Sequence, residues 1–477
     1  MLVKDLSPLV LWVLQQSPAS VLEQSPCLSF YGSSHSGKAH IFGTTDDSCV
    51  ADASKHFAAR DALRFESEHH NSSQLVWFER DTDAHDPSIA SETHSNFGHV
   101  FDNILGFSEN TAAYASQQAV QDHTRFVEVL EVHEHSALVR LERSMAQTVD
   151  TQLPRFWKSM ILPEEPISYL PVPAPAVKRV QQLLDGLKFD PVIQSLVNSL
   201  SISQMKKDIE YLTGEDPKSP IVSRHSFSDG VRIAANWLKD RFEENGATCE
   251  LKSFRVGFAP NVICKYAATA PTNETVLLSA HYDSRGSFGS FRAPGGDDDG
   301  SGTTAVLAIA RAIGKKGITF TKNVELCTFA GEEQGLLGSR AYAEELRAAG
   351  ADLTLMVQAD MTAYRKAGEP PQLGLPATIG TTEVTQLVSN ISAIYSPELT
   401  VGFTAACCSD HQSFHELGYP ATQVFERAGP IADPMYHNSG DLSDREGYDF
   451  HQLKSIAKVQ FATLLHAAGY KVSDDML

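Results

Sequence analysis

The sequence contains no long apolar segment and no excess of positive charge. Its 477 residues include no run of about 18 consecutive apolar residues, so we expect no helix that spans a membrane. Asp and Glu outnumber Lys and Arg by 59 to 39, which gives a net charge of −20. A protein that binds nucleic acid needs a basic surface to displace the counterions of the phosphates. The composition therefore argues against both a membrane protein and a nucleic-acid-binding protein.

Cysteine is also scarce, and the G-x-S-x-G motif of many serine hydrolases is missing. Seven cysteines are too few, and an odd number, for the disulfide framework of a small secreted protein. Cys407 and Cys408 are adjacent, a spacing at which disulfides are uncommon, so we expect free or differently paired thiols there. With 42% hydrophobic and 21% charged residues, the chain has the composition of a globular protein with a sizeable core.

Charge and proline divide the chain into two parts. Residues 1–176 carry a net charge of −12 and 11 of the 18 histidines, and five prolines between residues 162 and 176 predict an extended linker. Within the first part, residues 1–25 include a short apolar run typical of a weak signal peptide. Residues 26–161 are predicted to form a small, acidic α/β region, and residues 177–477 a larger domain.

Two further features of the chain concern its surroundings and its local structure. Residues 27–60 are rich in Ser, Gly, His and Asp and are predicted to form loops. Sequons at Asn71, Asn273 and Asn390 permit glycosylation if the protein is secreted.

Strand-like and helix-like segments alternate after residue 176. The strand-like segments are Val276–Ala280, Val324–Ala330, Leu353–Ala359 and Ala421–Phe425, and the helix-like segments are Ala305–Ile313, Leu336–Ala349, Val384–Tyr395 and Phe450–Ala468. This alternation predicts an α/β fold with a mostly parallel sheet covered by helices on both faces. In such sheets, ligands bind beyond the carboxyl ends of the strands.

Histidines and acidic residues follow these strands directly or lie in later loops. Each alone has an ordinary structural explanation, such as a buried core histidine, a helix cap or a surface pair. Together, carboxylates at one sheet edge repel one another unless a cation neutralises them, and imidazole and carboxylate both suit zinc. The sequence therefore predicts a site for two divalent ions. The residues are His281, Asp283, the triplet Asp297–Asp299, Glu332, Glu333, Asp360 and His437.

His411 and His415 form a weaker candidate. Their i, i+4 spacing is half of a metalloprotease helix motif, but Gln412 stands where that motif needs a glutamate base. We therefore expect neither histidine to be a ligand.

The order of these motifs resembles the secreted zinc aminopeptidases of the bacterial and fungal leucine aminopeptidase type. The resemblance covers about residues 190–470 and implies a zinc exopeptidase fold, with a mixed, mostly parallel sheet between helices and two zinc ions. The matching motifs are His281–Asp283, Gly295–Gly302, Glu332–Ser339, Asp360–Thr362, Ser409–Phe414 and His437.

The resemblance also implies a role for each metal ligand. Asp298 would bridge the two zinc ions. His281 and Asp360 would bind one ion, and Glu333 and His437 would bind the other.

Two further acidic residues would serve the reaction itself. The resemblance makes Glu332 the general base that takes a proton from the attacking water and gives it to the departing amine. Asp283 would accept the second N–H of His281 and so set the tautomer of that ring.

The resemblance implies a preference for a bulky apolar first residue such as leucine. The predicted substrate pocket comprises Met361, Phe425 and Tyr436, which match apolar pocket positions of the family, together with Cys407 and Cys408. In the family, two separated cysteines form a disulfide beside this pocket, whereas Cys407 and Cys408 are adjacent here. The substrates would be peptides or proteins.

Residues 1–176 match no motif of the family, but they occupy the place of the pro-region that such secreted enzymes carry. We therefore expect residues 26–161 to act as an intramolecular inhibitor or folding aid that is removed.

Other functions stay open at this point. A carboxypeptidase would need a basic site for the substrate carboxylate, for which Arg285, Arg292 and Arg427 are available. A glutaminyl cyclase of the same fold group would bind one zinc, but both ligand sets are complete. A non-catalytic binding module would be expected to have lost a ligand or Glu332, and none is lost.

Overall fold

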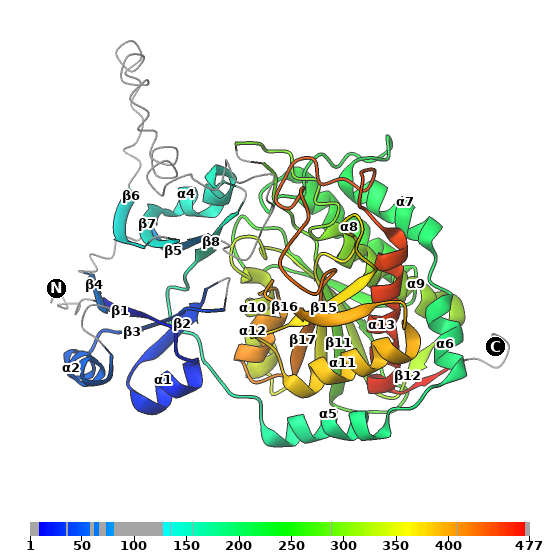
Figure 1. The fold of residues 1–477 in the computed structure, drawn as a ribbon, viewed down its shortest axis with the longest axis horizontal. Coiled ribbons are helices and arrows are strands. Elements are labelled where there is room, and N and C mark those ends of the chain that lie inside the picture. Colours follow the sequence, from blue (N-terminus) through cyan, green and yellow to red (C-terminus); the bar gives the residue numbers. More distant parts are fainter. Residues whose placement is uncertain are drawn as a thin grey trace, which may run out of the picture. The chain divides into compact units, whose positions relative to one another are not determined.

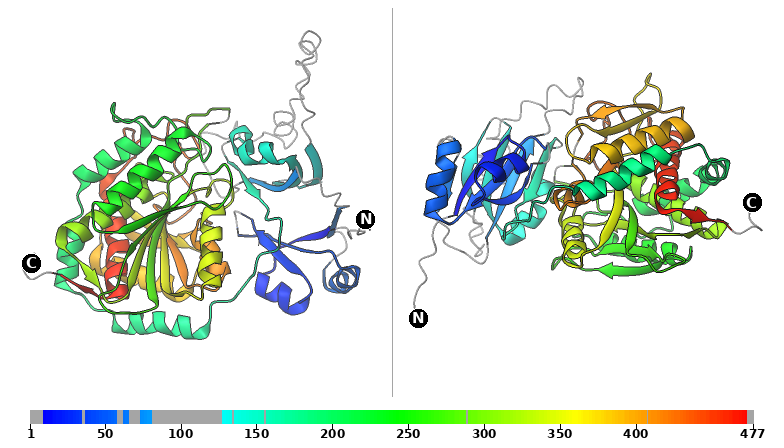
Figure 2. Two further views of the ribbon diagram at one scale, coloured as in Figure 1. Left: turned by 180° about the vertical axis from the view of Figure 1, so that it is seen from behind. Right: turned by 90° about the horizontal axis from the view of Figure 1, so that it is seen from below.

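A computed structural model of the chain shows two compact units, which Figures 1 and 2 draw. Unit 1 extends to Tyr169, and unit 2 runs from Leu170 to the end of the chain, so the boundary lies inside the proline-rich segment. No helix of the described ranges is long and apolar enough to cross a membrane. The structure describes residues 9–34, 37–57, 62–65, 73–80, 127–133, 135–154, 156–287, 289–406 and 408–472.

Unit 1 contains two four-stranded antiparallel sheets. The first has the order β2-β3-β1-β4, and the second has the order β6-β7-β5-β8. Leu11 and Ile41 of the first sheet pack in one apolar cluster with Trp77 and Leu138 of the second. The strands are β1 (Leu9–Leu14), β2 (Ser29–Ser33), β3 (His40–Thr44), β4 (Ala62–Phe65), β5 (Ser73–Arg80), β6 (Val127–Val132), β7 (Ser136–Glu142) and β8 (Trp157–Ile161).

The other face of the first sheet packs against helices. Val10, Trp12 and Leu14 alternate with Leu11 along β1, and they share a cluster with residues of α1 (Pro18–Gln24) and α2 (Asp47–His56). The apolar run considered above as part of a signal peptide is thus a strand that is paired on both sides. Unit 1 also contains the short helix α4 (Arg143–Thr148) and the 3₁₀ turn η3 (Val149–Gln152).

The prediction of loops over residues 27–60 is wrong. These residues form β2, β3 and α2, and a disulfide joins Cys27 to Cys49. The small polar residues of this segment predicted loops, but cross-strand pairing and the disulfide stabilise regular structure here, and neither follows from local composition.

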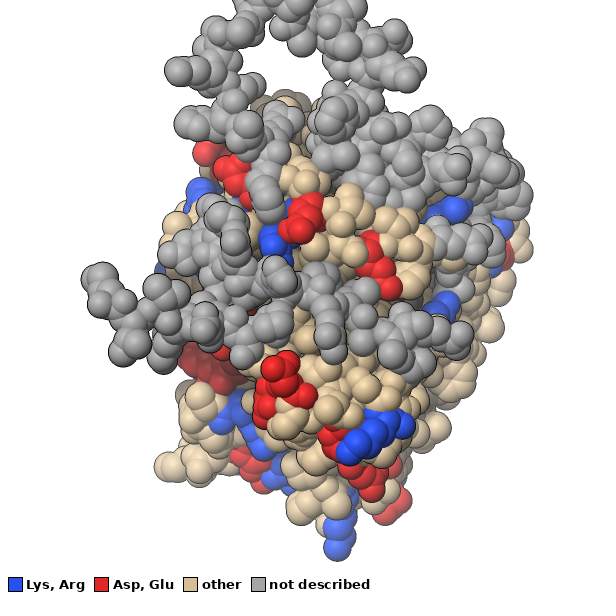
Figure 3. Space-filling view, turned by 90° about the vertical axis from the view of Figure 1, so that its left-hand side faces the viewer, with Lys and Arg blue, Asp and Glu red and all other residues tan. Residues whose placement is uncertain are grey.

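On the face drawn in Figure 3, the acidic and basic side chains of the described residues are interspersed.

Unit 2 is built on a six-stranded sheet of the order β17-β14-β11-β13-β10-β9. The four strands β17, β14, β11 and β13 are parallel, whereas β10 and β9 are antiparallel to their neighbours. This confirms the predicted mixed, mostly parallel sheet. The strands are β9 (Thr248–Lys252), β10 (Asn261–Tyr266), β11 (Glu274–His281), β13 (Asn323–Phe329), β14 (Asp352–Ala359) and β17 (Ala421–Val424).

Helices cover both faces of this sheet, as Figure 2 shows. Val276 and Leu278 of β11 belong to the large core beneath α8 (Asp229–Glu243), α9 (Gly300–Lys316) and α13 (Phe450–Ala468). Leu277 points to the opposite core. Parallel strands that are buried on both faces are apolar throughout, which is why these segments could be recognised in the sequence.

The remaining helices complete the two layers. The core around Leu277 includes side chains of α10 and α12. Two pairs of short strands, β15 with β16 and β12 with β18, lie outside the main sheet. The bounds are α5 (Ala174–Gly186), α6 (Pro191–Asn198), α7 (Ile202–Thr213), α10 (Leu337–Ala348), α11 (Thr382–Tyr395), α12 (His411–Glu416), β12 (Thr319–Phe320), β15 (Gln372–Pro376), β16 (Thr400–Thr404) and β18 (Tyr470–Lys471).

The cysteines of unit 2 are mostly oxidised. Cys249 and Cys264 form a disulfide across the paired strands β9 and β10, and Cys327 is a buried free thiol. Cys408 is disulfide-bonded, so of the two expected alternatives, a free thiol or a different pairing, the free thiol is wrong at this residue. Cys407 lies outside the described residues.

Candidate active site

The candidate site lies at the carboxyl edge of the parallel strands. His281 ends β11, Glu332 and Glu333 follow β13, and Asp360 follows β14. Because parallel strands end at the same edge of the sheet, the topology brings these residues together. Asp298 lies in the turn before α9, and His437 lies in the loop after β17.

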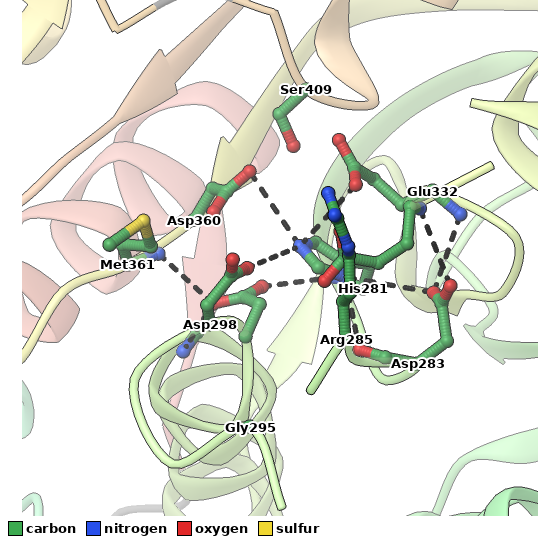
Figure 4. Close-up of polar contacts among 12 residues, drawn as sticks. His281, Asp283, Arg285, Gly295, Asp298, Glu332, Asp360, Met361 and Ser409 are labelled. Carbon is green, nitrogen blue, oxygen red and sulfur yellow. Dashed lines mark hydrogen bonds and ion pairs between the residues drawn. The ribbon is translucent and has the colours of Figure 1, made fainter. Parts of the chain in front are cut away.

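The structure gathers the five predicted ligands into two groups that share Asp298. In the first group, His281 Nε2 lies 3.3 Å from Asp298 Oδ1 and 3.7 Å from Asp360 Oδ2. In the second, His437 Nε2 lies 3.3 Å from Asp298 Oδ2 and 3.1 Å from Glu333 Oε2. The two oxygens of one carboxylate therefore face the two groups, and Figure 4 shows His281 between Asp298, Asp360 and Glu332.

Burial and charge oppose each other within this cluster. Burial alone would lower the pKa of His281, but the nearby carboxylates, led by Glu332, outweigh it and raise that pKa well above its usual value. Burial would raise the pKa of Asp298, whereas the nearby imidazole rings of His281 and His437 lower it far below the usual range. The carboxylates thus draw positive charge to this position.

Asp283 lies behind His281, where its main-chain oxygen is closer to the ring than its carboxylate, and it also supports the two glutamates. His281 Nδ1 is 3.2 Å from the main-chain oxygen of Asp283 and 3.6 Å from its carboxylate. That carboxylate accepts hydrogen bonds from the main-chain N–H groups of Glu332 and Glu333, both at 3.4 Å, and from the Ser226 hydroxyl at 2.9 Å. Asp283 therefore connects the first histidine with the turn that carries both glutamates.

Asp299 positions three main-chain N–H groups around the site, a role that no sequence pattern indicated. One carboxylate oxygen accepts the N–H of Gly302 at 2.9 Å as the N-cap of α9, and also the N–H of Met361 at 3.2 Å. The other accepts the N–H of His281 at 3.1 Å. A side chain at Gly302 would come within 2.7 Å of the Ala359 carbonyl oxygen, so only glycine lets the helix approach this closely.

Two buried charged residues, Asp441 and Arg224, hold the turn around Asp298, and no local sequence pattern indicated either role. The main-chain N–H of Asp298 donates to Asp441 Oδ2 at 3.0 Å, and Arg445 in turn binds Asp441 at 3.0 Å. Arg224 is fully buried and donates to the carbonyl oxygens of Tyr282 at 2.8 Å and Gly295 at 2.7 Å. Burial lowers the pKa of Arg224 to about 10.

The four described residues of the predicted pocket are buried, with exposures between 1% and 4%. Met361 follows Asp360 directly, and the Tyr436 ring stacks on His437 with ring centres 3.8 Å apart. Met361 and His437 both have a φ of 50°, and such strained residues are frequent at functional sites. The other two are Phe425 and Cys408.

Ser409, Asp410 and His411, which begin the predicted motif Ser409–Phe414, are buried and belong to neither ligand group. Gln358 on β14 donates to Ser409 at 3.1 Å and to Asp410 at 3.2 Å, and burial raises the pKa of Asp410 to about 7. His411 Nε2 lies 3.1 Å from the Ile379 carbonyl oxygen, and burial lowers the pKa of His411 to about 3. The structure thus gives His411 a core position.

The arrangement fits divalent metal ions, zinc among them. Both groups combine an imidazole nitrogen with carboxylate oxygens, the donors that zinc accepts. His281 Nε2 and Glu333 Oε1 are buried and have no hydrogen-bond partner among the described residues. Buried polar atoms are rarely left in this state, and a metal ion bound by each group would give them a partner.

Comparison with known proteins agrees with this arrangement. Residues 261–463 match the family described as Peptidase family M28. "Leucine aminopeptidase 1" of Sclerotinia sclerotiorum is 32% identical over 285 residues, which cover 55% of this chain and 70% of that protein. A "Probable leucine aminopeptidase" of Trichophyton verrucosum is 33% identical over 279 residues, which cover 56% of this chain and 72% of that protein.

Solved structures with a similar fold include LapB and the LapA aminopeptidase of Legionella pneumophila. LapB has a TM-score of 0.60 at 16% identity and covers 83% of this chain and 100% of its own. LapA has a TM-score of 0.58 at 16% identity and covers 84% of this chain and 99% of its own. Because unit 2 makes up only about two thirds of the chain, this likeness in fold extends into unit 1. With the matching region and the fungal relatives, these findings show that the chain belongs to peptidase family M28.

Proposed function

We propose that this chain is a zinc aminopeptidase that removes the first residue of peptides or proteins and favours leucine-like residues there. The observation that carries this proposal is the pair of ligand groups that share Asp298, with Glu332 beside them and outside both. The names of the fungal relatives support the amino-terminal specificity. Membership of a peptidase family makes the chain a peptide hydrolase.

Five residues would hold two ions. His281, Asp298 and Asp360 form one site, and Asp298, Glu333 and His437 form the other. Bound zinc would acidify a water molecule and supply positive charge for the peptide carbonyl oxygen.

Glu332 would carry the proton. Its carboxylate is buried, and Oε2 lies 3.9 Å from His281 Nε2, next to the cluster. A carboxylate that is not needed as a ligand can accept a proton from water and donate it to the departing amine. Asp283 would keep this carboxylate in place through the main-chain N–H groups of Glu332 and Glu333.

The carboxypeptidase alternative is not favoured. Arg427 forms two hydrogen bonds of 2.8 Å with Glu369, so its charge is already balanced. Arg292 is exposed, and Arg285 contacts His437. The complete second ligand group likewise argues against a cyclase with one zinc, and the retained Glu332 argues against a non-catalytic module.

The substrate assignment can be tested with two small substrates. We expect the purified chain to hydrolyse leucine p-nitroanilide, and to leave intact a peptide with a blocked amino terminus and a free carboxyl terminus. Removal of metal with a chelator should abolish the activity, and added Zn²⁺ should restore it. Hydrolysis of the blocked peptide alone, or activity that survives complete metal removal, would contradict the proposal.

Unit 1 is proposed to be a pro-region that restrains or helps to fold unit 2 in a secreted precursor. This proposal rests on its acidic, histidine-rich composition and on the linker. The linker is anchored at both ends, because the N–H of Ile167 donates to Phe30 in unit 1 and that of Leu170 donates to Glu416 in unit 2. Pro171 and Pro173, which lie between Leu170 and the start of α5, are exposed. Proteases prefer such extended, exposed chain. The alternative is an accessory domain that stays attached.

Cleavage of the linker distinguishes these two roles. A recognition site for a specific protease placed at residues 171–173 would allow the folded full chain to be cut. We expect cleavage, followed by release of unit 1, to raise the rate of leucine p-nitroanilide hydrolysis. A chain with a scrambled, uncleavable site serves as the control. Equal activity before and after cleavage would rule out inhibition by unit 1.

A further inference from the structure

The two candidate ligand histidines differ in what lies behind the ring. The rear nitrogen of His281, Nδ1, faces only oxygen acceptors of Asp283, at 3.2 and 3.6 Å. The rear nitrogen of His437, also Nδ1, lies 3.2 Å from Nη1 of Arg285. Arg285 is 3% exposed, so this contact is buried.

This difference sets a different tautomer for each ring. A guanidinium has hydrogen-bond donors and no acceptor, so His437 Nδ1 must accept the hydrogen bond from Arg285. The single proton of the neutral His437 ring is then on Nε2, the atom that faces Asp298 and Glu333. In the neutral form of His281, by contrast, Nδ1 carries the proton that its acceptors in Asp283 favour, and Nε2 keeps a lone pair. A metal ligand needs that lone pair on the atom that faces the metal.

The position of Arg285 is held by a pair of hydrogen bonds between two loops. The main-chain N–H of Ser287 donates to the Ser439 hydroxyl at 3.0 Å, and that of Ser439 donates to the Ser287 hydroxyl at 2.9 Å. The Ser439 hydroxyl also donates to the Arg292 carbonyl oxygen at 2.6 Å. The loop with Arg285 and the loop with His437 are therefore fixed to each other two residues beyond each side chain.

We propose that Arg285 makes the metal site of Glu333 and His437 weaker than the site of His281 and Asp360. For His437 Nε2 to bind an ion, the ring proton must be on Nδ1, where it faces the N–H donor of Arg285. The ion also adds positive charge near the guanidinium of Arg285. Binding there breaks the contact between Arg285 and His437, whereas binding at His281 leaves the Asp283 contacts intact. This inference rests on the proposed two-metal centre and assigns Arg285 as a positioning residue that controls how fully it is occupied.

The test is a stepwise zinc titration of the metal-free full chain against a chromophoric chelator. We expect two binding steps, of which His437→Ala removes the weaker one. Arg285→Met removes the donors and the charge, and it should strengthen the weaker step by about tenfold, the lower end of what changes behind a ligand produce. The tighter step should change less than about twofold.

Two controls separate the hydrogen bond from a general charge effect. Arg285→Lys keeps a charge and only donors, so it should bind zinc nearly as the unaltered chain does. Arg292→Met removes an exposed charge from the same loop and should have no effect on either step. Circular dichroism and thermal unfolding of each metal-free variant check that it is folded.

Several results would overturn the assignment. Equal affinity of the two binding steps would do so, as would loss of the tighter step in His437→Ala. An unchanged weaker step in Arg285→Met, or the absence of a second bound ion in both the unaltered chain and Arg285→Met, would do so as well. The readout is zinc affinity, so its failure is distinct from a failure of the proposed function. Shifted binding steps in a chain that cleaves no peptide would support the role of Arg285 and contradict the aminopeptidase.

Discussion

Glu332→Gln is expected to lower kcat by about 10²–10⁴-fold, the range that loss of a general base usually costs, while zinc stays bound. Glutamine has the shape of glutamate but cannot take up a proton from water. Because Glu332 belongs to neither ligand group, both groups keep all their donors. The measurements are kcat with leucine p-nitroanilide and the zinc content of the purified variant.

Two other glutamates provide matched controls. Glu333→Gln makes the same change one residue away, but it removes a candidate ligand and should lower the zinc content. Glu325 is buried on the same strand, β13, where it binds Lys265 and Tyr342, and Glu325→Gln should leave kcat nearly unchanged. Near-normal turnover in a zinc-replete Glu332→Gln variant would show that another group accepts the proton.

Asp298→Ala is expected to release at least one of the two zinc ions and to abolish activity. Asp298 is the only residue shared by the two groups, and its two oxygens face His281 and His437 at 3.3 Å each. Without it, two cations would lie close together with no shared anion between them. Zinc content per chain, measured after dialysis, gives the result directly.

Neighbouring substitutions show whether the bridge itself is responsible. Asp298→Asn keeps the volume and removes the charge, so it should lose zinc as well. Asp297→Asn alters the preceding side chain, which accepts a hydrogen bond from Ala363 at 2.8 Å and belongs to neither group, and it should retain both ions. Two fully occupied sites in Asp298→Ala would place the bridge elsewhere.

Much of unit 2 could be predicted from local sequence. Segments such as Val276–Ala280 and Val324–Ala330 are apolar throughout because both faces of the strand are buried, and each lies within a strand of the structure or ends one residue beyond it. Unit 1 was harder to predict. The prediction missed β2 and β3, because their stability comes from pairing with distant strands and from the Cys27–Cys49 disulfide.

The candidate ligands could be predicted for the same reason as the strands. His281, Glu333 and Asp360 stand directly after recognisable strands or one short turn later, so the fold class alone places them at one edge. The roles of Asp299, Arg224 and Arg285 could not be predicted. Asp299 looks like an ordinary helix cap, and an isolated arginine in a sequence does not reveal what it will contact.

The sequence by itself determined the order of the main strands along the chain and which side chains with potential metal-ligand atoms follow them, because these depend on local apolar pattern and residue type. The family resemblance already implied that Asp298 stands between the two histidines, but only the tertiary structure decided which of its oxygens faces which ring and that Asp283 supports the glutamate turn. Only it placed an arginine donor behind His437 and carboxyl and carbonyl acceptors behind His281. Hydrogen bonds of this kind join residues that are up to about 150 positions apart, and their direction depends on how loops pack against each other, which no local pattern records.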